Sequence, residues 1–133
     1  MRFTGFLTVM GVVMAATAAQ AENVTQLQGY SKTYVQCMSA SHGVQNKTKT
    51  CVNKEIKLQK KLLKKNFKTY QKANRGNVQV VKQQHQFFET LIKQQCPLSV
   101  RSAYGQLQQA QCELNMIISQ SNLYAARSLH KAS

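Results

Sequence analysis

The sequence predicts an all-α domain, either a small antiparallel four-helix bundle or a pair of helical hairpins, stapled by two disulfides. Three observations support this class. Apolar residues recur at helical steps in four successive segments. Alternating runs typical of strands are few, and the chain contains a single proline. Four cysteines occur in a chain that opens like an exported protein, and an even cysteine count in such a chain is typical of disulfides.

The start of the chain resembles a secretory signal peptide. Arg2 precedes the apolar run Phe6–Ala18, and Ala19–Ala21 forms a small-residue cleavage pattern. The apolar run is shorter than the roughly 20 residues that span a bilayer, and no later segment is apolar enough to do so. We therefore expect residues 1–21 to be cleaved. Residues 22–133 would then form one domain in a bacterial periplasm or outside the cell.

The first two helices are predicted from apolar stripes. The first stripe precedes a stop at Gly43 and comprises Val24, Leu27, Tyr34 and Met38. The second lies in the segment 51–73, CVNKEIKLQKKLLKKNFKTYQKA, in which eight of the 23 residues are lysine. Its apolar residues are Val52, Ile56, Leu63, Phe67 and Tyr70. The turn signal 74–77 should end this helix.

Two further helices are predicted in the second half of the chain. The third stripe stops before Pro97 and comprises Val81, His85, Phe88, Leu91 and Ile92. The fourth follows Gly105 and comprises Leu107, Ala110, Leu114, Ile117 and Tyr124. Short connections make consecutive helices antiparallel neighbours.

The cysteines can be placed on this topology. Cys37 and Cys51 flank the first connection symmetrically, and Cys96 and Cys112 flank the last. This favours the pairs Cys37–Cys51 and Cys96–Cys112. The alternative, Cys37–Cys112 with Cys51–Cys96, also joins residues at one end of the bundle, so sequence leaves the pairing open. No pair has the close spacing of zinc ligands, and we expect no metal.

The sequence predicts a binding protein rather than an enzyme, and no cofactor. Aspartate is absent, and no phosphate-binding loop or metalloprotease motif occurs. The glutamates are expected to balance nearby lysines, and they are Glu22, Glu55, Glu89 and Glu113. His85 lies on an apolar stripe, where we expect a buried, hydrogen-bonded side chain.

A row of lysines is a candidate binding surface for an alternative function. These residues lie on the predicted second helix, away from its apolar stripe, and are Lys57, Lys61, Lys64, Lys65, Lys68 and Lys72. Such a row suits envelope polyanions such as lipopolysaccharide or acidic glycans, through contacts that salt weakens. Nucleic acid is disfavoured, because base recognition uses arginine and exposed aromatic side chains. Residues 22–133 contain three arginines, Arg75, Arg101 and Arg127.

Residues 37–123 resemble the LprI-type family of small exported proteins. The matching positions on the lysine-rich helix are Cys51, Glu55, Leu63 and Phe67, preceded by Cys37. Those on the later helices are Gln84, Phe88, Cys96, Gly105, Cys112 and Leu123. The chain departs from the family at Lys60 and Lys64, where relatives often carry Asp and Asn, and at Phe88, where they often carry Trp.

The resemblance implies lysozyme inhibition by binding. Many lysozymes are basic, so a chain with a net charge of +14 is repelled by them on approach. The nearly uncharged segment Pro97–Gln106 (PLSVRSAYGQ) is therefore the expected contact with the active cleft. Its candidate residues are Ser102, Tyr104 and Gln106.

Overall fold

The computed structural model describes residues 29–132, which form four α-helices and one short 3-10 helix. The elements are α2 (Lys32–Ser41), α3 (Gln45–Ala73), η1 (Arg75–Asn77), α4 (Val78–Gln95) and α5 (Ala103–Ala132). No strand occurs within 29–132, and the predicted all-α class is confirmed. The expected signal peptide, Val24 and Leu27 lie outside the described residues.

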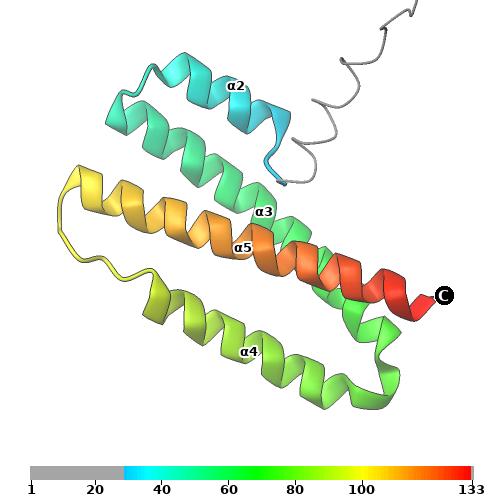
Figure 1. The fold of residues 1–133 in the computed structure, drawn as a ribbon. Helices are drawn as coiled ribbons and strands as arrows, with labels where there is room; N and C mark the ends of the chain where they lie inside the picture. Colours follow the sequence, from blue (N-terminus) through cyan, green and yellow to red (C-terminus); the bar gives the residue numbers. More distant parts are fainter. Residues whose placement is uncertain (1–28, 133) are drawn as a thin grey trace, which may run out of the picture.

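The two longest helices, α3 and α5, form the centre of the fold. Consecutive helices run antiparallel, as predicted, so α3 and α5 run parallel to each other (Figure 1). They share the largest helix–helix contact of the described chain. Asn66 of α3 donates to Ser121 Oγ of α5 at 2.9 Å, and Ser121 is fully buried. This small residue helps the two helices approach closely.

The other two helices pack against different halves of this pair. α2 lies along the first half of α3, where Ser41 and Thr48 hydroxyls are 3.1 Å apart. α4 lies beside the second half of α3, where His85 stacks on Phe67 with ring centroids 4.0 Å apart. Each hairpin, α2–α3 and α4–α5, therefore contributes one long central helix and one shorter outer helix.

The lysine-rich segment becomes helix α3 because it contains neither glycine nor proline and is rich in lysine, leucine and glutamine. The chain enters it through His42 and Gly43, whose φ angles of 47° and 75° are left-handed. Gly43 adopts this conformation without a steric penalty, which confirms the predicted stop of the preceding helix. At the other end, Asn74 donates its side-chain amide to the Tyr70 carbonyl at 2.7 Å.

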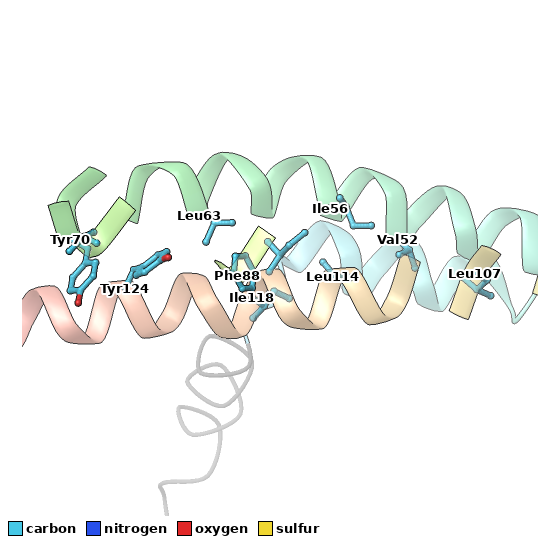
Figure 2. Close-up of a cluster of buried hydrophobic side chains, with 11 residues drawn as sticks. Val52, Ile56, Leu63, Tyr70, Phe88, Leu107, Leu114, Ile118 and Tyr124 are labelled. Atoms are coloured by element: carbon cyan, nitrogen blue, oxygen red, sulfur yellow. The ribbon is translucent and has the colours of Figure 1, made fainter. Parts of the chain in front are cut away.

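The apolar core lies between α3 and α5, with contributions from α4. Figure 2 shows the core side chains pointing into the space between the two long helices. Its buried members are Val52, Ile56, Leu63, Tyr70, Val81, Phe88, Leu107, Leu114, Ile117, Ile118 and Tyr124. Burying one such large side chain contributes about 1.5–3 kcal/mol. The predicted stripes of the second and fourth helices are confirmed, with Phe67 and Ala110 partly buried at the edge.

Each hairpin is closed by one disulfide near its connection. Cys37 bonds Cys51, with Cα atoms 5.7 Å apart, and Cys96 bonds Cys112, with Cα atoms 5.6 Å apart. The favoured pairing is confirmed, and the alternative pairing does not occur. In the loop-entropy model each bridge stabilises the fold by roughly 3 kcal/mol. No disulfide joins the two hairpins, so apart from the chain at η1 they are held together by non-covalent packing.

Glu55 does not balance surface lysines, contrary to expectation. It is buried at 3% exposure, and its two carboxylate oxygens accept hydrogen bonds from the Ser31 backbone N–H (2.9 Å) and the Ser31 hydroxyl (2.6 Å). The Gln59 amide donates to the same carboxylate at 2.7 Å and to the Gly29 carbonyl at 2.6 Å. Ser31 caps α2, so the carboxylate lies at the positive end of that helix. Glu55 therefore ties the start of α2 to α3.

Replacing Glu55 should destabilise the fold. In Glu55→Ala the Ser31 donors and the Gln59 amide lose a buried acceptor, and we expect a loss of about 1–3 kcal/mol in the free energy of unfolding. Urea denaturation with the disulfides intact measures this loss. Glu89→Ala, which removes an exposed carboxylate, is the matched control and should change stability by less than about 0.5 kcal/mol. Equal effects of the two substitutions would contradict a structural role for Glu55.

Candidate functional site

The lysine face of α3 consists of Lys57, Lys61, Lys64, Lys65, Lys68 and Lys72. All six side chains are exposed. At 3.6 residues per turn their positions span an arc of about 100° on the helix, and the core residues of α3 lie on the opposite side. The structure therefore brings together the six lysines that the sequence singled out.

Five of these lysines surround a shallow hollow of about 390 Å³. They are Lys61, Lys64, Lys65, Lys68 and Lys72, and Thr69 completes the lining. Among the described residues none of them forms an ion pair with a carboxylate. Like charges held this close attract counter-ions strongly, and a polymer with repeated anionic groups can displace those counter-ions. The arrangement suits a multivalent anion.

In the other predicted site, Pro97–Gln106, the three candidate residues have different roles. Two of them make hydrogen bonds within the protein, and one is exposed. The Ser102 hydroxyl accepts the Gly105 N–H at 3.0 Å and so caps the start of α5. The Gln106 side chain accepts a hydrogen bond from the Lys49 ammonium group of α3. Tyr104 is 57% exposed, and its hydroxyl accepts from Gln108 at 2.8 Å. Only Tyr104 of the three predicted residues combines a large apolar surface with free access from solvent.

Sequence reasoning missed two apolar side chains beside Tyr104. Leu98 and Val100 are exposed at 40% and 58%. Gly105 explains their position, since a Cβ atom there would lie 2.0 Å from the Val100 carbonyl oxygen. The missing side chain lets the loop fold against the first turn of α5. The run LSV in the sequence was the available signal for an apolar loop.

A groove of about 780 Å³ lies between α3 and α4, with α5 at its base, and the sequence did not predict it. Its apolar lining comprises Leu63, Phe67, Phe88, Ile92 and Ile117. Its lysines are Lys60, Lys64, Lys68 and Lys93. The available signal was the alternation of lysine and apolar residues at steps of three and four from Lys60 to Lys68. Lys60 and Lys64, where the chain departs from the LprI-type pattern, both line this groove.

His85 lies in the groove wall and is hydrogen-bonded, as expected, but its side chain is half-buried and not fully buried. Its Nδ1 lies 3.0 Å from the Tyr124 hydroxyl, and its Nε2 lies 3.7 Å from Glu89. Burial lowers the pKa of His85 below 6.5, against a smaller opposing effect of Glu89. Burial likewise raises the pKa of Tyr124, so its hydroxyl stays neutral beside the imidazole. His85 therefore has a structural role in the wall of the groove.

The lowered pKa of His85 should make stability depend on pH. The unfolded chain binds this proton more readily than the folded chain, so the contribution is present above pH 6.5 and is lost as pH falls through the lowered folded pKa. Between about pH 7.5 and pH 5, His85→Gln should show a smaller drop in melting temperature than the wild type. If the melting temperature of His85→Gln falls as much as that of the wild type, His85 is not the source of the pH dependence.

Residues 29–132 were also compared with the requirements of metal binding, thiol chemistry and membrane insertion. No group of three His, Cys, Asp or Glu side chains in this range could hold a metal ion. All four cysteines are oxidised in disulfides. None of the described helices has the length and apolar character needed to cross a bilayer. Comparisons with protein-family models, curated proteins and solved structures give no match.

Proposed function

We propose that this chain is an exported envelope protein that binds acidic glycans through the lysine face of α3. The observation that carries the proposal is the hollow lined by five lysines, none of which forms an ion pair with a carboxylate within residues 29–132. Export is supported by the two disulfides, which persist in oxidising compartments, and by the signal-peptide pattern of residues 1–21.

The chemistry of the lysine face favours a glycan over a nucleic acid. The exposed apolar residues that border this face are Leu58 and Leu62, and the aromatic Tyr70 of the same helix is buried. Stacking of bases needs exposed aromatic or arginine side chains, which the face does not supply. Lysine ammonium groups are point charges that fit sulfate, phosphate or carboxylate groups without demanding one geometry.

Neutralising the hollow should weaken binding to heparin, used as a model acidic glycan. We expect Lys61→Gln, Lys65→Gln, Lys68→Gln and Lys72→Gln combined to lower the affinity at least about tenfold, because four charge-assisted contacts are lost. The control carries the same change of net charge at scattered exposed sites, namely Arg75→Gln, Lys82→Gln, Arg101→Gln and Arg127→Gln. Isothermal titration calorimetry measures both. Equal losses in the two variants would show that net charge, and not the hollow, drives binding.

Lysozyme inhibition is the second candidate, and the loop between α4 and α5 supports it. Leu98, Val100 and Tyr104 present apolar surface beside the Cys96–Cys112 disulfide. A loop held in this way loses little conformational entropy on binding. Arg101 is the one charged residue of Pro97–Gln106, so the loop itself adds little repulsion toward a basic enzyme.

An activity assay with several lysozymes tests this second function. The protein in micromolar excess should inhibit at least one of them, and Tyr104→Ala should weaken the inhibition at least about tenfold, as expected for an exposed aromatic anchor. Phe87→Ala removes an aromatic side chain on α4 that is 67% exposed, and it should leave the inhibition unchanged. Full lysozyme activity in the presence of the wild-type protein would refute this function.

A further inference from the structure

We propose that the groove between α3 and α4 binds a fatty acid, with the acyl chain on the apolar floor and the carboxylate on lysines of the rim. This ligand class is separate from the acidic glycan of the proposed function. The volume of about 780 Å³ falls in the range of small-molecule sites, about 300–1,000 Å³.

The floor of the groove is apolar and long. Leu63, Phe88 and Ile117 are buried at its base, while Phe67 and Ile92 are half-buried and leave apolar surface uncovered. On α3 the lining extends from Lys60 to Gln71, a distance of about 16 Å at 1.5 Å per residue. A linear hydrocarbon chain matches this shape, and covering exposed apolar surface favours its binding.

The rim carries a positive excess that suits an anionic head group. Four lysines line the groove, and the two carboxylates that join them are Glu89 and Glu113. Glu89 has a side-chain exposure of 63%, and the four lysines are exposed as well, so solvent screens both signs of charge. Glu113 is half-buried and lines the groove on the same side as Lys60, so four lysines face two carboxylates. The remaining positive excess favours a fatty-acid anion over an amphiphile of the same length with a cationic head.

The helix register places the head group at one end. His85 stacks on Phe67, which aligns the antiparallel helices α3 and α4 at that level. Lys60 is seven residues before Phe67, and Ile92 is seven residues after His85. Lys60 therefore lies level with Ile92 and Lys93, and two lysines from different helices border this end of the groove. We assign the carboxylate to Lys60 and Lys93.

The groove and the hollow share Lys64 and Lys68 but differ in their other lysines. Of these two sites, Lys60 and Lys93 line only the groove, and Lys61 and Lys65 line only the hollow. All four are exposed, so their replacement by glutamine preserves the core. The two binding activities can therefore be separated in one fold.

Calorimetry with dodecanoate, below its micelle concentration, tests the inference. The wild-type protein should bind it saturably and should bind dodecyltrimethylammonium at least about tenfold more weakly. Lys60→Gln with Lys93→Gln should weaken dodecanoate binding about tenfold and leave heparin binding unchanged. Lys61→Gln with Lys65→Gln should weaken heparin binding and leave dodecanoate binding unchanged. The two variants therefore test the two functions independently.

Three results would overturn the inference: no saturable binding of dodecanoate, equal binding of dodecyltrimethylammonium, or wild-type affinity in Lys60→Gln with Lys93→Gln. Ile92→Gln makes the floor polar and should weaken dodecanoate binding at least about tenfold. If Ile92→Gln does not fold, the two-lysine variant decides, because its substitutions lie on the surface.

Discussion

The parallel contact between α3 and α5 is the interaction on which the rest of the structure depends. Each hairpin is closed by its own disulfide, but no disulfide connects the hairpins. Their association is maintained by the core between the two long helices and by the hydrogen bonds from Asn66 to the buried Ser121. A net charge of +14 opposes compaction. The disulfides act locally against that repulsion, and the apolar contact acts across the whole molecule.

This contact also determines which surfaces α3 can offer to partners. One side of α3 is committed to α5, and the start of α2 is fixed to it by Glu55. The lysines then point outward on the opposite side, where they form the hollow, and the flank facing α4 forms the groove. Lys64 and Lys68 belong to both surfaces. The same helix is thus the structural centre of the fold and the carrier of both proposed binding sites.

Much of the fold was predictable because it depends on local periodicity. The apolar stripes, the stop at Gly43 and the favoured disulfide pairing each depend on residues close together in the sequence, although the sequence left an alternative pairing open. Features that depend on contacts between distant segments were not predictable. Glu55 stands among lysines and reads as a surface residue, but its burial depends on donors from Ser31, 24 residues earlier. Likewise, the six exposed lysines followed from helical spacing, whereas the groove depends on how α4 lies beside α3. The fold class and the lysine face could therefore be predicted from the sequence, whereas the groove between α3 and α4 could not.

The central claim is that α3 presents an electrostatic binding surface, and the salt dependence of binding tests it most directly. The affinity of the wild-type protein for heparin should be measured from about 50 to 200 mM sodium chloride. Release of counter-ions from the lysine hollow predicts a linear fall of log affinity with log salt, with a loss of at least about tenfold over this range. An affinity that stays constant across the same range would contradict the claim, because binding would then not depend on the charges of α3.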